Sequence, residues 1–220
     1  MTITVPSLNR LPAAERGITI GDFLVPVQLG ERISSRARHV ALIVAGALLV
    51  ALSARIVIPT TPVPITGQTF AVLLVGGALG ARRGFLSLSL YVVMGFFLPV
   101  YADGSQGVAK IATIDGGQLV LGATGGYLIG FVVAATVVGR LAELGWDRSI
   151  GGAIAAMAIG NLLIYAVGVP WLMFAADLPA STAIAEGFTK FIPGDVLKLL
   201  LAAGLFPAAW WVVGRRPHER

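Results

Sequence analysis

Six apolar stretches, separated by short polar or proline-rich segments, set the pattern of this chain of 220 residues. They run from about 40 to 58, 68 to 81, 85 to 98, 119 to 141, 150 to 169 and 193 to 213. A helix needs roughly 20 apolar residues to cross a bilayer. The stretches therefore predict an all-α integral membrane protein with six transmembrane helices. The second and third are short, and a re-entrant hairpin is the alternative for that pair.

Polar segments flank this apolar region at both ends of the chain. We expect residues 1–37 to form a polar cytoplasmic arm, residues 38–214 the six-helix domain, and residues 215–220 a basic cytoplasmic tail. Within the arm, residues 18–27 contain alternating apolar positions, which favours a short strand or a segment that lies on a surface. The arm does not resemble a cleaved signal peptide, because no uninterrupted apolar core follows a basic start.

Basic residues are distributed unevenly beside the six stretches. If the N-terminal side is called inside, the inside flanks hold ten arginines, whereas the other side holds Lys110 and Lys190. The positive-inside rule then predicts that both termini are cytoplasmic, and six crossings satisfy that arrangement. The segments near 59–67, 99–117 and 170–192 become outer loops.

The composition agrees with a membrane protein, since 56% of the residues are hydrophobic and 12% are charged. A soluble domain carries about a quarter charged residues. With no cysteine, and with two histidines that only flank the apolar region, we expect no metal site, no cofactor and no catalytic residue. The net charge of +5 lies beside apolar spans, so it indicates membrane orientation and not a nucleic-acid partner. No Gly-Lys-Ser/Thr follows a glycine run, so the chain has no motif for ATP hydrolysis.

One acid and one base lie inside the sixth apolar stretch. Asp195 and Lys198, spaced i and i+3, leave the same helix face, and residues 199–213 carry no charge. Ionisable groups in hydrocarbon are costly unless they face a polar cavity or each other, so the pair predicts a ligand pocket that opens outward under the outer loops. A compact molecule with a carboxylate and N–H donors suits such a site. Lys198 would bind a carboxylate or carbonyl, and Asp195 would accept from an N–H or hold Lys198 in place.

Other polar side chains lie within or beside the spans. Asn161 and Tyr165 are spaced i and i+4 in the fifth stretch, Gln68 begins the second, and Tyr91 and Tyr127 lie in the third and fourth. Each has an ordinary structural alternative. The amide and the phenols can hydrogen-bond between helices, and Gln68 can cap its helix or tether a loop.

Small residues recur every four positions in several spans. The glycines from Gly76 to Gly84 and from Gly122 to Gly130 favour close packing between helices. Ala47 and Ala51 form a similar pair on the first helix. That face docks a partner helix if it points out of the bundle and packs internally if it points in, and the spacing does not separate the two.

Three runs of residues resemble signature segments of the BioY family. Residues 62–69 (Pro-Val-Pro-Ile-Thr-Gly-Gln-Thr) with 76–80 resemble its first outer loop and second helix. Residues 122–131 resemble its Gly-Pro-Thr-Gly-Gly-Tyr segment, with Ala123 in place of the usual proline, and residues 193–198 resemble its sixth-helix signature. The similarity covers about residues 40–213. BioY proteins are the biotin-binding S components of energy-coupling factor (ECF) vitamin transporters.

The resemblance implies a function and partners. The ligand would be biotin, a ureido bicycle with a valerate carboxylate, and the partners would be a transmembrane coupling subunit and a pair of cytoplasmic ATPases. The protein would be a multi-pass component of a prokaryotic plasma membrane that topples in the bilayer to carry its ligand inward. An S component for another small vitamin, or a solitary carrier without the ATPases, is the alternative.

The expected site residues follow from the polar residues and the resemblance together. The ligand-binding set is Asp195, Lys198, Asn161, Tyr127, Gln68, Thr66 and Tyr91, with Asp103 as a contact at the rim. The family docks its coupling subunit on an Ala-x-x-x-Ala face of the first helix, which Ala47 and Ala51 match. The loop between the third and fourth stretches and the N-terminal arm are both longer than the family pattern.

Overall fold

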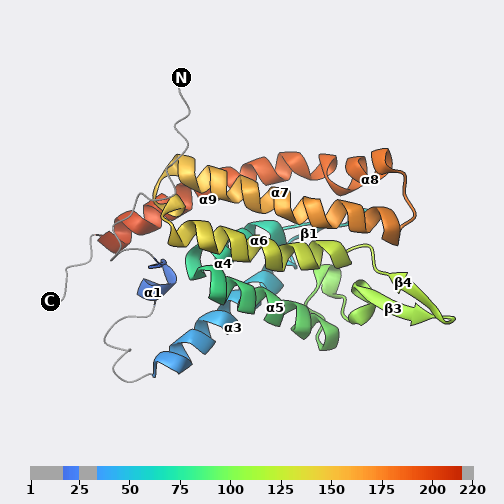
Figure 1. The fold of residues 1–220 in the computed structure, drawn as a ribbon, viewed down its shortest axis with the longest axis horizontal. Coiled ribbons are helices and arrows are strands. Elements are labelled where there is room, and N and C mark those ends of the chain that lie inside the picture. Colours follow the sequence, from blue (N-terminus) through green and yellow to red (C-terminus); the bar gives the residue numbers. More distant parts are fainter. Residues whose placement is uncertain (1–16, 25–33, 215–220) are drawn as a thin grey trace.

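A computed structural model of the chain describes residues 17–24 and 34–214. The rest of the predicted arm and the predicted tail, 215–220, lie outside this part. The described chain is mostly helical (Figure 1). Its α-helices are α1 (Gly21–Leu24), α3 (Ser35–Ser53), α4 (Gln68–Leu79), α5 (Ala81–Phe97), α6 (Gly125–Glu143), α7 (Ile150–Ala175), α8 (Ala180–Gly187) and α9 (Ile192–Gly214). Its 3₁₀ helices are η2 (Ala102–Gly104), η3 (Val108–Lys110), η4 (Trp146–Arg148) and η5 (Thr189–Phe191).

Four helical stretches of the described residues are long and apolar enough to cross a membrane. They are Ser35–Ser53, Gly125–Glu143, Ile150–Ala175 and Ala180–Val213, the last of which combines α8, η5 and α9. α4 has 12 residues and α5 has 17, so both are shorter than a typical span. The prediction of a mainly helical membrane protein is confirmed, and the prediction of six crossings stays a prediction.

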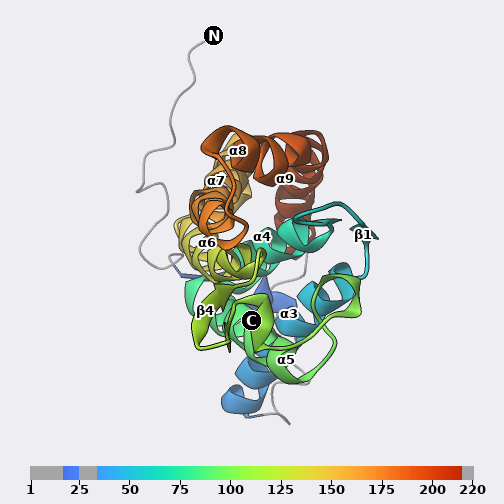
Figure 2. The same ribbon diagram turned by 90° about the vertical axis from the view of Figure 1, so that its right-hand side faces the viewer.

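α4 is the central helix of the bundle, where it contacts α3, α5, α6, α7 and α9 (Figure 2). Most of its residues are buried, as expected for a helix that is apolar all round. Two glycines bring its neighbours close. A Cβ atom at Gly76 would lie 2.5 Å from the Ala135 carbonyl oxygen of α6, and one at Gly77 would lie 2.5 Å from the Phe206 ring of α9. Gly76 therefore packs helices as its spacing predicts.

A β-hairpin occupies the predicted start of the fourth helix, near residue 119, so that boundary is wrong. β3 (Ala112–Asp115) pairs antiparallel with β4 (Gln118–Leu121), and α6 begins only at Gly125. The turn uses Gly116 and Gly117, with φ of +56° and +79°. Glycine adopts such values without steric cost, and a two-glycine turn between apolar runs is a hairpin signal.

Two further helix ends and one predicted loop differ from the prediction. α3 ends at Ser53, after which β1 (Val57–Ile58) and β2 (Ile65–Thr66) pair antiparallel and fold the proline-rich connector into a loop. α7 continues through Pro170 to Ala175, past the predicted end at 169. The extra turn is held by Trp171, whose Nε1 donates to the Gly122 carbonyl oxygen at 2.9 Å. The predicted outer loop 170–192 contains α8 and η5, so only part of it is irregular.

Part of the predicted arm is a packed element. Residues 17–24 lie at the end of the bundle where α3 begins and α9 ends (Figure 1). Asp22 forms a 2.8 Å ion pair with Arg83 of α5, and the Gly17 N–H donates to the Glu143 carbonyl oxygen at 3.1 Å. Residues 17–24 therefore pack on the bundle, and the cytoplasmic arm over residues 1–37 stays a prediction.

A buried carboxylate lies at the same end, in the connection between α6 and α7. Asp147 is 1% exposed, and its Oδ2 accepts from Trp210 Nε1 of α9 at 2.6 Å. The Arg148 guanidinium lies 4.4 Å above the Trp210 ring. Asp147 Oδ1 has no hydrogen-bond partner among the described residues. Burial raises the pKa of Asp147 to about 6 from its ordinary value of 3.8.

The raised pKa predicts that Asp147 makes stability depend on pH. The folded protein holds this proton more tightly than the unfolded chain, so ionisation destabilises the fold progressively between about pH 4 and pH 6, and the loss persists above. We expect Asp147→Asn, which keeps an acceptor for Trp210, to be more stable than the parent by about 3 kcal/mol at pH 7.5 and nearly equal at pH 4. Thermal unfolding of the detergent-purified proteins across pH measures this. Asp115→Asn, on the exposed hairpin, is the control, and parallel pH profiles for parent and Asp147→Asn would contradict the expectation.

Candidate functional site

The first turn of α9 carries the acid of the predicted pair. α9 begins at Ile192, with Pro193 and Gly194 before Asp195. Proline suits the first turn of a helix, whose N–H groups lack intrahelical acceptors, and a carboxylate there is stabilised by the helix dipole. Lys198 follows one turn later on the same face, and its Nζ lies 3.1 Å from Asp195 Oδ1.

The Lys198 ammonium uses all of its donors within the protein. Besides Asp195, it donates to the Thr66 carbonyl oxygen of β2 at 2.9 Å and to Thr69 Oγ1 of α4 at 2.8 Å. An ammonium group has three N–H donors, so none is left over in this structure. The Lys198 side chain is 18% exposed, and these bonds replace the hydration that burial removes.

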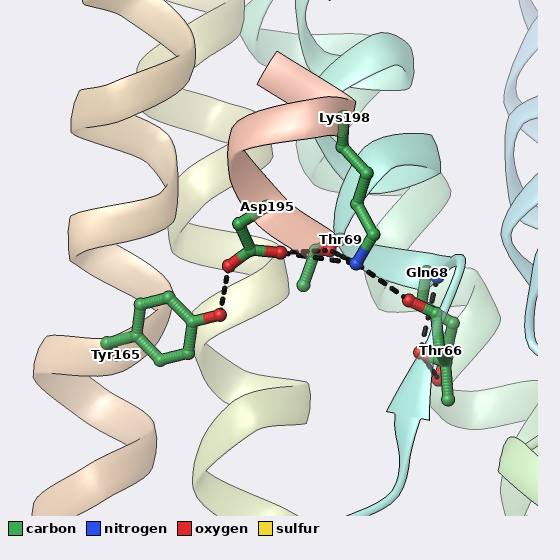
Figure 3. Close-up of polar contacts among 6 residues, drawn as sticks. All are labelled: Thr66, Gln68, Thr69, Tyr165, Asp195 and Lys198. Carbon is green, nitrogen blue, oxygen red and sulfur yellow. Dashed lines mark hydrogen bonds and ion pairs between the residues drawn. The ribbon is translucent and has the colours of Figure 1, made fainter. Parts of the chain in front are cut away.

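The Asp195 carboxylate is 6% exposed and has partners on both oxygens. Tyr165 of α7 donates its hydroxyl to Oδ2, and Thr69 Oγ1 donates to Oδ1 at 3.3 Å. Figure 3 shows this polar network, which joins β2, α4, α7 and α9. The pair predicted from the sequence therefore joins three parts of the chain that are far apart in the sequence: β2 with the adjacent start of α4, α7, and α9.

A second branch of the network starts at the same strand. Thr66 Oγ1 donates to Gln68 Oε1 at 3.1 Å, and Gln68 Nε2 donates to the Tyr91 hydroxyl of α5 at 2.6 Å. Tyr91 is completely buried, and its hydroxyl donates to the Val100 carbonyl oxygen at 3.3 Å. The Gln68 side chain therefore connects the site to α5, and Gly67 takes the N-cap position of α4.

The network borders a cavity of about 440 Å³, within the usual size range of small-molecule sites. Its walls come from the connector between β1 and β2, the first turn of α4, the segment after α5, and the start of α6. Tyr165 and Phe191 complete it, and their rings lie 6.1 Å apart. A polar side and an aromatic side therefore face one space.

Only some of the predicted site residues line the cavity. Thr66, Gln68, Tyr91 and Tyr127 line the cavity. Asp195 and Lys198 are not among the described lining residues and contact the cavity wall from behind, through Thr66, Thr69 and Tyr165. The Tyr127 hydroxyl donates to the Gly187 carbonyl oxygen at 2.8 Å, which connects α6 to α8.

Asn161 lies apart from this group. Asn161 is 9% exposed, is not among the described lining residues, and its Oδ1 has no hydrogen-bond partner in the described part of the chain. It lies one turn before Tyr165, which does line the cavity, and the ligand-binding role of Asn161 stays a prediction. Asp103 lies in η2, and its side chain is outside the described residues.

Several lining residues were not in the predicted set. Thr69 and Tyr165 bridge the charged pair to the cavity, and Tyr101, Thr124 and Lys110 come from the long loop and the start of α6. The i, i+4 spacing to Asn161 was a signal for Tyr165, whereas nothing local marks the loop residues. Burial raises the pKa of Tyr101 to about 12, so its hydroxyl stays protonated and donates to the Val92 carbonyl oxygen at 2.7 Å.

The predicted docking pair on α3 is buried in this structure. Ala47 has no exposed surface and Ala51 is 8% exposed, and the neighbouring Gly46 packs on Ser87 of α5. The exposed face of the same helix carries Ala41 and Ala45. In this conformation Ala47 and Ala51 therefore pack inside the bundle. Ala47 offers no accessible surface on which a partner helix could dock.

Comparisons with protein families, with other sequences and with solved structures point to the same family. A model of the BioY family matches residues 27–215. The biotin transporter BioY of Thermotoga maritima is 39% identical over 156 residues, which are 70% of this chain and 85% of the relative. The biotin transporter BioY2 of Lactococcus lactis subsp. cremoris is 34% identical over 169 residues, 76% of this chain and 87% of the relative. A crystal structure of the S-component for biotin from an ECF-type ABC transporter matches with a TM-score of 0.67 at 25% identity, covering 80% of this chain and 93% of that chain.

The charged pair should show strong energetic coupling. Asp195→Asn leaves a buried ammonium without its counter-charge, and Lys198→Met leaves the carboxylate without its own, so each should cost about 3 kcal/mol of stability. The double variant should lose at least about 1 kcal/mol less than the sum, as denaturation in detergent would measure. The half-exposed pair Lys190 and Glu186, 2.9 Å apart, is the control and should be nearly additive. Additive losses at Asp195 and Lys198 would show that the two charges do not stabilise each other.

Proposed function

Because this chain belongs to the BioY family, we propose that it captures biotin and translocates it across the membrane as the substrate-specific component of an ECF-type vitamin transporter. Besides membership of the BioY family, one structural observation supports biotin as the ligand. A cavity of about 440 Å³ has a complete polar network on one side and aromatic rings on another. Biotin has matching chemistry, with a ureido group that donates and accepts, an apolar bicycle, and a carboxylate on a flexible chain.

Six helices, α3 to α7 and α9, would cross the membrane with both termini in the cytoplasm. This arrangement is supported by the start of α3 and the end of α9, which lie at the same end of the bundle (Figure 1). Arg82 and Arg83 in the first turn of α5 and Arg148 between α6 and α7 belong to that end, as the positive-inside rule requires of a cytoplasmic side. The cavity, bordered by the β1–β2 connector and the loop after α5, then opens outward.

Transport would draw its energy from partner subunits. The chain has no P-loop motif, and in the described part no group of three or more His, Cys, Asp or Glu residues is arranged to hold a metal ion. A transmembrane coupling subunit and a pair of cytoplasmic ATPases, as the ECF context of the structural relative suggests, would supply the ATP chemistry. The protein would work in the plasma membrane of a prokaryote.

Purified protein should bind biotin in a 1:1 ratio by isothermal titration calorimetry. We expect Thr69→Val to weaken binding roughly 10- to 100-fold, because it removes one acceptor of Lys198 and one donor to Asp195 at the cavity wall. Thr136→Val is the matched control, since the Thr136 hydroxyl only donates to Val132 within α6 at 2.7 Å. If the titration gave binding heat with another vitamin and none with biotin, the family membership would stand and the assignment of biotin as the ligand would be overturned.

A solitary carrier is the second candidate for the mode of transport. Uptake of biotin by cells that express this chain but lack every coupling ATPase would favour that reading. Abolished uptake in those cells, with restored uptake when an ECF module is supplied, would favour the S component.

The coupling subunit should dock on the exposed face of α3. Ala45→Leu adds bulk on that face and should reduce ATP-dependent uptake while biotin binding stays unchanged. Ala51→Leu adds the same bulk to a buried position and should lower the melting temperature instead, because overpacking a core costs about 1–3 kcal/mol. Uptake assays in proteoliposomes and thermal unfolding separate the two effects. Normal uptake by Ala45→Leu would place the docking surface elsewhere.

A further inference from the structure

The cavity needs a cation for the ligand's carboxylate, and Lys198 does not have a free donor to offer. Its three N–H groups are used by Thr66, Thr69 and Asp195 at 2.8–3.1 Å. A carboxylate placed at Lys198 would have to displace one of these acceptors and would also approach the Asp195 carboxylate, which repels it. The polar network behind the cavity is therefore suited to the neutral ureido group and poorly suited to an anion.

Lys110 is the one charged residue among the described residues that line the cavity. It ends η3, in the loop between α5 and α6, on a different wall from α9. The described structure records no hydrogen bond or ion pair for its ammonium, so its N–H donors are available for a ligand. Its side chain is half-buried, so an ion pair there would be weakened less by solvent than one on the open surface.

The backbone at Lys110 is held firmly in place. The Lys110 carbonyl oxygen accepts from Thr124 Oγ1 at 3.4 Å, and the next residue, Ile111, accepts from the Gly122 N–H at 2.9 Å. A Cβ atom at Gly122 would lie only 2.3 Å from the Lys110 carbonyl oxygen, so the absence of a side chain at Gly122 permits this contact. The loop thus positions Lys110 against the start of α6.

Neighbouring hydroxyls on this wall are already committed as donors. Thr124 donates to Lys110, Ser105 donates to the Ala102 carbonyl oxygen at 2.9 Å, and Tyr127 donates to Gly187. Each can still accept a hydrogen bond, but an anion requires donors. On this wall the ammonium of Lys110 is therefore the group suited to an anion.

We propose that Lys110 binds the valerate carboxylate of biotin, so that the ureido end lies toward Thr66, Thr69 and Tyr165. This assignment rests on the proposed function. Lys110 is then a specificity residue that favours the free acid over neutral derivatives of the same bicycle. The carboxylate is ionised at neutral pH, so the pair forms under transport conditions.

A two-ligand comparison tests the proposal in the full-length protein. Biotin and biotinamide, which replaces the carboxylate by a neutral amide, are titrated into the parent protein and into Lys110→Met. We expect Lys110→Met to bind biotin roughly tenfold more weakly, the loss of about one charge-assisted hydrogen bond, while its affinity for biotinamide changes less than twofold. Lys190→Met is the matched control, because it removes an outer cation that is already paired with Glu186, and it should leave both affinities within twofold.

Each outcome has one meaning. Equal losses for both ligands, or no loss for either, would overturn the role of Lys110 while leaving the proposed function intact. Failure of the parent protein to bind either ligand would instead overturn the proposed function.

If Lys110→Met does not fold, a salt titration of the parent protein alone tests the role of Lys110. Its preference for biotin over biotinamide should shrink as salt rises from about 10 mM to 500 mM, because added salt screens the ion pair. A preference that salt does not change would contradict the proposal.

Discussion

Removing Asp195 and Lys198 from water is costly, and their mutual attraction alone does not restore what hydration supplied. Thr66, Thr69 and Tyr165, which come from β2, α4 and α7, supply the other hydrogen bonds that the two charged groups need. These elements must therefore meet α9 at hydrogen-bond distance. The cavity forms where they converge, so its polar wall is a consequence of satisfying the buried pair. A change at any of the three partners would disturb the pair and the cavity together.

Packing and polar bonding depend on each other through α4. Thr69 lies in the first turn of this helix, and Gly76 and Gly77 lie two turns later. Because the glycines let α6 and α9 approach the α4 backbone, Thr69 can reach a carboxylate on α9. A side chain at Gly77 would push away the Phe206 ring and with it the helix that carries Asp195. The short central helix thus acts as the common reference for the site, which explains why it is buried all round.

The sequence was most informative where a residue type is costly in its surroundings, such as a charged side chain in an apolar span. A charged pair in an apolar span pointed to Asp195 and Lys198, and apolar periodicity located the long helices. It was least informative where contacts between distant segments decide the outcome. Trp171 extends α7 through a proline by binding Gly122, and Lys110 reaches the cavity because its loop packs on the start of α6. The spacing of Ala47 and Ala51 marked close packing but not its direction, since which face of α3 meets α5 depends on the whole bundle.

The state of the donors also bears on how a ligand would be held and released. The groups behind the cavity already bond to one another, so the ureido end of biotin would exchange protein hydrogen bonds for ligand hydrogen bonds, with a modest net gain for each. Tight binding would then depend on the aromatic wall formed by Tyr165 and Phe191, on the shape of the cavity, and on a charge contact away from the network. Tyr91 joins the network to Val100, at the start of the loop that carries Lys110, whereas the hydrogen bonds of Asp195 and Lys198 in the described structure do not reach that loop. A ligand that contacts both would link them, and movement of either segment would weaken its hold without unpairing Asp195 and Lys198.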